Sequence, residues 1–422
     1  MFKKIVLKNG LRVVSVPLKN TQTATVLVLA ATGSKYETRE INGISHFLEH
    51  LLFKGTKKRP TPVDIAEPLD RAGGVYNAFT GEEYTGYYVK AEAGHFDLGL
   101  DVISDIYLNS KLDPAEIEKE RGVIIEEINM YYDHPSSYVQ ILWNKMLYGD
   151  QPAGWEITGT KQSVSKISRQ DLVRYVQNQY AAENTIVCFA GNIPSEKEIV
   201  RKTEKYFSGI RANKALKKPK VIEKQTSPAL ILHKRETDQC HLYLGVRGYD
   251  IFHPKKYAFE VLADILGGMM SSRLFVKIRE EMGAAYYISA DAESSSDTGF
   301  LAAKAGVDNK KIDSVISAIL EEYRKAKEKK IDSKELKKSK EHIIGKMSLL
   351  LETSDAQASF YGVQETLEKN ILTPKEIYDK INKVSAEDIL AAAKEIFRPE
   401  NLNLAIIGKF EDEKRFQKLL KI

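Results

Sequence analysis

Two histidines and a glutamate in the segment 43–55 have the residue types and the spacing of a metal site. Read as a helix that ends at Gly55, the segment places His46 and His50 one turn apart on one face, with Glu49 beside them. Two neutral imidazoles and one carboxylate suit Zn²⁺ with water in an open fourth position. Glu49 is placed to take the proton of that water. The alternative interpretation is a pair of surface histidines on an amphipathic helix.

A second predicted helix carries further candidate carboxylates. It starts at 113–116, where Asp is the N-cap, Pro takes the first helical position and Glu stands three residues after the cap. Glu120 and Glu127 share one face of this helix, and an inward-facing carboxylate pair is costly unless it meets a cation. The residues alone leave two points open. The face could be a solvated acidic stripe, and Glu126 could replace Glu127 as a third ligand.

The composition is that of an ordinary globular protein. With 422 residues the chain is too long for one core, which predicts at least two domains. The net charge is only +5, so no nucleic-acid partner is implied, and no apolar run approaches the length of a membrane span. Cys188 and Cys240 lie in apolar, strand-like runs, which favours buried thiols in a reducing compartment. Because residues 1–7 lead directly into a strand without a cleavable leader, we expect a cytoplasmic protein.

The two halves of the sequence resemble each other. Lys-Ile-Ser-Arg-Gln-Asp-Leu at 166–172 resembles Lys-Val-Ser-Ala-Glu-Asp-Ile at 383–389, and Val-Ile-Ser at 102–104 recurs 213 residues later. Matched spacing at several places predicts two copies of one domain, joined by a Lys- and Pro-containing linker. We therefore predict an α+β protein of two homologous repeats, each a mixed or antiparallel sheet covered by helices on one face. The chain divides into a zinc-binding catalytic domain at 1–210, a linker at 211–228 and a homologous domain without metal at 229–422.

The second copy lacks the candidate ligands of the first. Ser339 and Lys346 stand where the first copy has Glu120 and Glu127, and no second histidine pair is present. A shared fold keeps helices wherever packing needs them, but it keeps ligands only where an ion is bound. We therefore expect one Zn²⁺ per chain, with the second copy serving as a partner or substrate platform.

With these motifs, the chain resembles the pitrilysin/insulinase family of inverted zinc peptidases. Within it, the chain is similar to the short two-domain branch that includes mitochondrial processing peptidase and its bacterial homologues. The resemblance rests on His-x-x-Glu-His at 46–50, on a glutamate 77 residues after the second histidine, and on another glutamate seven residues before that first glutamate. The resemblance covers nearly the whole chain and implies the LuxS/mitochondrial-processing-peptidase-like metallohydrolase fold. It further implies Zn²⁺ bound by His46, His50 and Glu127, Glu49 as the general base, and Glu120 orienting a metal-bound imidazole.

The resemblance also implies residues that hold the substrate. The segment 266–275 is similar to the family's glycine-containing loop, and Arg279 and Tyr286 have the family's separation of seven residues. Both would contact substrate near the scissile bond, and Tyr286, with Arg279, would stabilise the carbonyl oxygen as charge develops there. Without the resemblance, they would be interpreted as a surface arginine and a packed tyrosine. The family's edge strand, to which an extended peptide adds as an extra strand, is matched by Asn77, Ala78, Phe79 and Thr80.

Together these implications predict a zinc-dependent metalloendopeptidase that hydrolyses peptide bonds of extended oligopeptides or leader peptides. The family's short chains dimerise, and the second domain of one chain faces the zinc of the other. Because this chain carries both half-sites, we expect a homodimer whose site is completed by the partner chain; a heterodimer is the other arrangement. We expect no nucleic-acid or membrane partner. The alternative function is a catalytically inactive paralogue that acts as a scaffold or as the binding subunit of a heterodimer.

Overall fold

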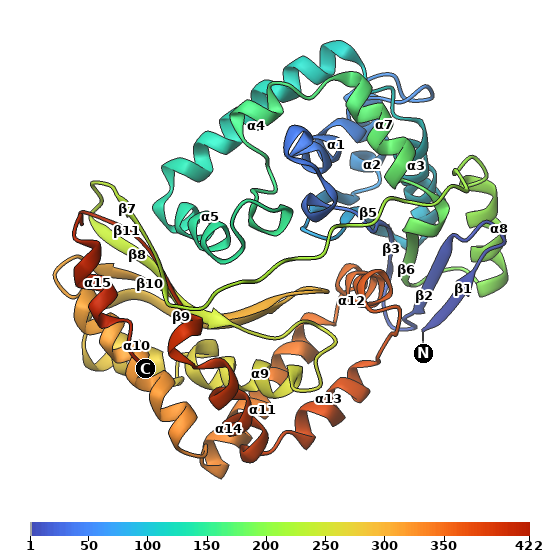
Figure 1. The fold of residues 1–422 in the computed structure, drawn as a ribbon. Helices are drawn as coiled ribbons and strands as arrows, with labels where there is room; N and C mark the ends of the chain where they lie inside the picture. Colours follow the sequence, from blue (N-terminus) through green and yellow to red (C-terminus); the bar gives the residue numbers. More distant parts are fainter. Residues whose placement is uncertain (1) are drawn as a thin grey trace. The chain divides into compact units, whose positions relative to one another are not determined.

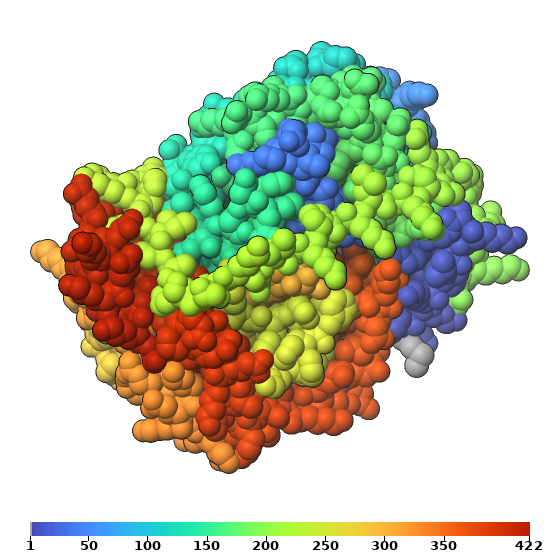
Figure 2. Space-filling model, viewed as in Figure 1, coloured from blue at the N-terminus to red at the C-terminus, as the bar shows by residue number. Residues whose placement is uncertain are grey.

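The computed structural model describes residues 2–422, which fold into two compact units, each built on one β-sheet (Figure 1). Neither unit is a continuous stretch of sequence. The first runs from the N-terminus to Asn129 and adds Trp155–Pro219 and Leu349–Leu372; the second consists of Met130–Gly154, Lys220–Ser348 and Thr373–Ile422. The units therefore differ from the predicted division at 210 and 229, which stays a prediction about the repeats. Residues 212–228 contain no helix or strand and lie on the surface, lime green in Figure 2.

The first unit contains a six-stranded mixed sheet in the order β1-β2-β6-β3-β5-β4. Neighbouring strands are antiparallel except β2 and β6, which are parallel. Among the described residues, β4 pairs only with β5, so one of its edges carries backbone groups without a strand partner. The strands are β1 (Lys3–Val6), β2 (Arg12–Pro17), β3 (Thr23–Ala30), β4 (Val75–Thr80), β5 (Thr85–Glu92) and β6 (Thr185–Gly191).

Helices cover both faces of this sheet. α3 packs beside Val26 and Val89, whereas α12 packs beside Leu27 and Leu29. Successive side chains of a strand point to opposite faces, so α3 and α12 lie on opposite sides. The helices are α1 (Ile44–Leu52), α2 (Pro62–Arg71), α3 (Phe96–Asn109), α4 (Pro114–Asp133), α6 (Lys161–Val164), α7 (Arg169–Gln179), α8 (Glu196–Tyr206) and α12 (Ser354–Leu367), with short 3-10 turns η1 (Ser34–Tyr36), η2 (Arg39–Ile41), η3 (Ala93–His95) and η5 (Ala182–Asn184).

The second unit contains a five-stranded sheet with the same arrangement, but without a counterpart of the edge strand β1. Its order is β7-β11-β8-β10-β9, and only β7 and β11 are parallel. The strands are β7 (Ala229–Lys234), β8 (Gln239–Arg247), β9 (Ala285–Ser294), β10 (Gly299–Asp308) and β11 (Leu402–Gly408). The helices are α5 (Pro135–Tyr148), α9 (Lys256–Ala263), α10 (Ile312–Glu328), α11 (Ser333–Leu350), α13 (Pro374–Lys383), α14 (Ala386–Ile396) and α15 (Glu413–Leu419), with the π-helical turns η6 (Asp264–Gly268) and η7 (Phe275–Glu281) and the 3-10 turns η4 (Pro152–Gly154) and η8 (Pro399–Asn401).

The residues that repeat in sequence do the same work in each unit. Ser168 starts α7 with a capping box in which its side chain accepts from the Asp171 N–H, and Ser385 starts α14 in the same way with Asp388. In a capping box the acidic side chain also bonds the N-cap backbone, so two unsatisfied donors are paired. The repeated segments at 166–172 and 383–389 thus start two equivalent helices, α7 in the first unit and α14 in the second.

The structure confirms an α+β fold of two homologous repeats with mixed sheets. The expectation that helices cover one face of each sheet was wrong. The second face is covered by α12 in the first unit and by α5 in the second, where Trp143 packs against Tyr243 and Phe300. α12 comes from the second half of the sequence but covers the first sheet, and α5 comes from the first half but covers the second sheet. The sequence analysis missed this because an amphipathic pattern does not identify the sheet that a helix covers. No helix among the described residues is both long and apolar enough to cross a membrane.

The position of α12 predicts how the first half of the chain behaves alone. A fragment of residues 1–219 should lack a cooperative thermal transition, because it exposes the apolar sheet face around Leu27 and Leu29. Fusion of residues 349–372 to this fragment through a flexible linker should restore the transition, measured by calorimetry. A fusion with the same α12 residues in scrambled order is the control. A cooperative transition in the unfused fragment would contradict the prediction.

Candidate metal centre

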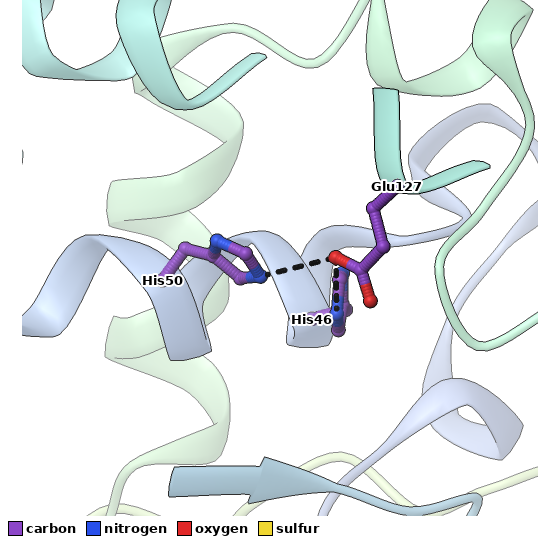
Figure 3. Close-up of side chains that lie close together, drawn as sticks. All are labelled: His46, His50 and Glu127. Carbon is purple, nitrogen blue, oxygen red and sulfur yellow. Dashed lines mark ion pairs between the residues drawn. The ribbon is translucent and has the colours of Figure 1, made fainter. Parts of the chain in front are cut away.

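α1 and α4 bring together three side chains that can bind one metal ion. The Oε2 atom of Glu127 lies 3.5 Å from Nε2 of His46 and 3.5 Å from Nε2 of His50 (Figure 3). Among the described residues this is the one group of three or more His, Cys, Asp or Glu side chains whose ligand atoms all lie within 4.8 Å of one another. Tetrahedral zinc with N and O ligands at about 2.0–2.2 Å separates its ligands by roughly 3.4 Å. The donor types and the spacing therefore fit Zn²⁺.

The three side chains also match in charge. Hydrogen bonds from His46 and His50 hold the pKa of the Glu127 carboxyl well below its usual range, although partial burial opposes them. Burial lowers the pKa of His50, but hydrogen bonds to Glu127 and Glu120 outweigh it, and the net effect raises the pKa. The carboxylates therefore create a negative potential where the imidazole nitrogens converge, and this favours a cation.

Glu120 holds His50 from behind. Its Oε2 atom lies 3.2 Å from Nδ1 of His50, and its Oε1 atom lies 2.8 Å from the Lys54 ammonium. A carboxylate on the far nitrogen fixes the tautomer that leaves Nε2 free to bind metal. The predicted role of Glu120 thus has a matching geometry. Lys54 was missed by the sequence analysis, because a lysine one turn after a histidine carries no signal of its own.

Glu126 and Glu127 point in different directions from α4. Glu126 is exposed and accepts a hydrogen bond from Asn129, at 3.2 Å, whereas Glu127 is half-buried and faces the two histidines. The geometry therefore favours Glu127 as the third ligand. The residues alone had left this choice open.

A buried carboxylate fixes the start of α1. Glu37 accepts hydrogen bonds from the backbone N–H of Gly43 at 2.7 Å and of Ser45 at 2.9 Å, and from the Asn42 amide at 3.0 Å. It thus does the work of an N-cap for the helix, whose first N–H groups lack partners and favour a negative charge. The contribution of Glu37 was missed because it precedes the first residue of the helix by seven positions, whereas an N-cap residue precedes it by one.

Glu49 lies beside the group of His46, His50 and Glu127 and contacts the edge strand β4. The Thr80 hydroxyl, at the end of β4, donates to its Oε2 atom at 2.6 Å. The predicted peptide-binding segment from Asn77 to Thr80 lies on β4, the edge strand of the first sheet. Phe79 lies against Gly86 of the neighbouring strand.

Arg279 and Tyr286 belong to the second compact unit, whereas His46, His50 and Glu127 belong to the first. Arg279 lies on η7, with its guanidinium carbon 4.9 Å from the centre of the Phe275 ring. Tyr286 lies on β9, the edge strand of the second sheet, and is 75% exposed. The simpler interpretation of Tyr286 as a packed side chain is therefore wrong. Its role toward substrate stays a prediction.

Known proteins resemble this chain along almost its whole length. It matches the model described as insulinase (peptidase family M16) over residues 12–161 and the model described as M16 inactive domain over residues 166–343. It is 37% identical over 412 residues to the uncharacterized zinc protease YmxG of Bacillus subtilis. The alignment covers 97% of this chain and 98% of that protein. The chain belongs to the insulinase (M16) family of peptidases. The predicted resemblance is confirmed.

Solved structures share the M16 fold. A protease from Helicobacter pylori superposes with a TM-score of 0.90 at 24% identity, over 96% of this chain and 99% of that one. A chain of complex III2 from Candida albicans, bound to Inz-5, superposes with a TM-score of 0.85 at 18% identity, over 100% of each chain. At these identities the likeness concerns the fold. The relatives named as zinc proteases agree with zinc as the metal that the site suits.

The centre predicts different effects for two neighbouring substitutions on α4. Glu127→Gln should weaken zinc binding by more than the 10–100-fold that is typical for loss of an outer-shell partner, because it removes an anionic ligand. Glu126→Gln should leave the affinity nearly unchanged and is the matched control. Competition with a chromophoric chelator measures both. Equal affinity of the Glu127→Gln variant and the wild type would show that the third ligand is another residue.

Proposed function

We propose that this M16 protein is a zinc-dependent metalloendopeptidase that cleaves extended oligopeptides or leader peptides. One observation carries the proposal: the group of His46, His50 and Glu127 has Glu49 beside it, and Glu49 is hydrogen-bonded to the end of an edge strand. A purely structural zinc site is closed by four protein ligands, whereas this group has three and leaves a position for water or substrate. The M16 relatives named as zinc proteases support the same activity.

The residues of the site have distinct tasks in this proposal. Zinc held by the three ligands would polarise a water molecule and the substrate carbonyl. Glu49 accepts the proton of the attacking water and then delivers it to the leaving amine. Glu120, braced by Lys54, keeps the His50 ring in the orientation that the metal requires. Tyr286 and Arg279 would donate to the carbonyl oxygen as negative charge develops there.

The substrate in this proposal binds through its backbone. The free edge of β4 offers N–H and C=O groups to an added strand, and Asn77, Ala78, Phe79 and Thr80 line this edge. Backbone pairing of this kind accepts many sequences but requires an extended conformation. It therefore suits unfolded oligopeptides and leader segments better than folded proteins.

The proposed assembly is a homodimer with one zinc ion per chain. The zinc ligands lie in one compact unit and the Arg279/Tyr286 pair in the other, so each chain carries two half-sites. A second copy of the chain could complete each site, and a heterodimer with a related chain could do so as well. Cys188 and Cys240 are free and buried, which agrees with the proposed cytoplasmic location, where thiols stay reduced.

The inactive paralogue remains the second candidate function. It is favoured by the match of residues 166–343 to a domain described as inactive. That match covers mostly the second repeat, in which Ser339 and Lys346 replace the two glutamates. The first repeat retains two histidines, the third ligand candidate and the base. Hydrolysis of a peptide library by the zinc-loaded protein, lost with a chelator and restored by zinc, would separate the two functions.

Glu49→Gln should abolish hydrolysis while zinc stays bound. The amide preserves the shape of the side chain but cannot accept the proton, and a positioned base contributes on the order of 10²–10⁴-fold. Zinc content measured by atomic absorption should equal that of the wild type. Glu126→Gln, the same chemical change on an exposed residue, serves as the control. Turnover at the wild-type rate in a zinc-loaded Glu49→Gln variant would rule out Glu49 as the base.

The proposed dimer predicts rescue between two inactive variants. One carries Glu49→Gln and the other Tyr286→Phe, so a mixed dimer contains one site with both defects and one with neither. After random exchange of equal amounts, about half the dimers are mixed and up to about a quarter of wild-type activity should return. Exchange is verified by mass spectrometry with one variant isotopically labelled. Verified exchange without recovered activity would mean that each site is completed within one chain.

A further inference from the structure

We propose that Thr80 is a positioning residue that holds the Glu49 carboxylate in its working orientation. The Thr80 hydroxyl donates to Oε2 of Glu49 at 2.6 Å, a short bond of the charge-assisted kind. The sequence analysis had assigned Thr80 only to substrate binding along β4. The geometry gives it a second partner within the chain. This inference rests on the proposed peptidase function of the same site.

The hairpin end that carries Thr80 is fixed by its neighbours. In the turn after β4, the Gly81 carbonyl accepts from the Ser34 N–H at 3.4 Å, and the Glu82 carbonyl accepts from the Lys35 N–H at 2.9 Å. The turn is also tied by two ion pairs, Lys35 with Glu82 at 3.0 Å and Lys218 with Glu83 at 2.9 Å. Both lysine side chains are largely buried, which makes these pairs harder to separate than surface pairs.

The other end of the bond is fixed separately. Glu49 lies on α1, whose start is held by Glu37 and whose Ser45 hydroxyl bonds the Tyr175 hydroxyl at 2.8 Å. The Tyr175 hydroxyl in turn lies 2.8 Å from the Thr32 hydroxyl. Thr80 and Glu49 therefore face each other from two independently anchored elements. The hydroxyl is a fixed point that restricts the rotamers of the carboxylate.

This restraint has a consequence for the reaction. With Oε2 engaged by Thr80, Oε1 is the carboxylate oxygen left to accept the proton of the attacking water. A carboxylate held in this way does not lose rotamer freedom when the reaction starts, which lowers the entropic part of the barrier. Thr80 is the last residue of β4, the strand beside which the peptide would bind. The same strand therefore positions both the peptide and, through Thr80, the base Glu49.

The kinetic test uses Thr80→Val, which keeps the branched shape and removes the hydroxyl, and Thr80→Ser, which keeps the hydroxyl. We expect Thr80→Val to lower kcat about tenfold, at the low end of the range for outer-shell partners, with KM unchanged. Thr80→Ser should retain most of kcat. In a Glu49→Gln background, Thr80→Val should have no further effect, because the group it positions is already inactive. A rise in KM with unchanged kcat would overturn the proposal and assign Thr80 to substrate binding alone.

A structural measurement separates this proposal from the proposed activity. Crystal structures of the zinc-loaded wild type and of the zinc-loaded Thr80→Val variant should show Glu49 in one rotamer in the former and in several in the latter. Zinc affinity, measured by chelator competition, should be equal in both. If Glu49 does not contact Thr80 in the zinc-loaded wild type, the proposal is overturned whether or not peptides are cleaved. If the contact and its loss are seen but no peptide is hydrolysed, the proposed function fails instead.

Discussion

Two imidazoles on one helix and a carboxylate on another must meet within 3.5 Å, and the first unit is arranged around this meeting. α1 has only nine residues, too few to be stable without tertiary support. Glu37 supplies part of that support at its N-terminus. On the α4 side, the Arg121 guanidinium donates to the Ile167 carbonyl at 3.0 Å and lies 5.4 Å from the centre of the Phe47 ring on α1. One arginine therefore links both ligand-bearing helices and the segment before α7.

The parts of this site that follow a local rule could be predicted from the sequence. His46, Glu49 and His50 lie within one helical turn or so, and the periodicity of a helix alone puts them near each other. The pairing with Glu127 depends on the packing of two distant helices, and only the family resemblance supplied it. Glu37 acts across a loop, Thr80 acts between a strand and a helix, and Lys54 acts between the turn after α1 and α4. No spacing rule relates such residues, so their contributions became visible only in three dimensions.

The fold divides in the same way between local and non-local information. The sequence repeats at 166–172 and 383–389, which form the capping boxes of α7 and α14, and the repeat of 102–104 predicted two copies of one domain. The compact units, however, do not follow the two halves of the sequence: α12, from the second half, belongs to the first unit, and α5, from the first half, belongs to the second unit. An apolar helix face predicts that the face is buried, but it does not identify the sheet against which the helix packs. Each sheet is thereby buried on both faces, which explains why β6 and β11 are apolar and buried almost throughout.

The second unit indicates what the metal group contributes. It keeps the sheet order of the first unit, yet its described residues contain no group of three metal-binding side chains. Ser339 occupies the position of Glu120 in the repeat, and its hydroxyl donates to Oδ2 of the buried Asp264 carboxylate at 2.6 Å. The other oxygen of this carboxylate, Oδ1, lies 2.7 Å from Nδ1 of His342. The carboxylate there is satisfied by protein partners, so its stability needs no cation. Since the same frame folds with such a closed polar cluster, the His-His-Glu group of the first unit is not required by the fold. Bringing two imidazoles and two carboxylates together at one place costs free energy that the packing of the fold does not require. This supports the proposal that the group binds an ion.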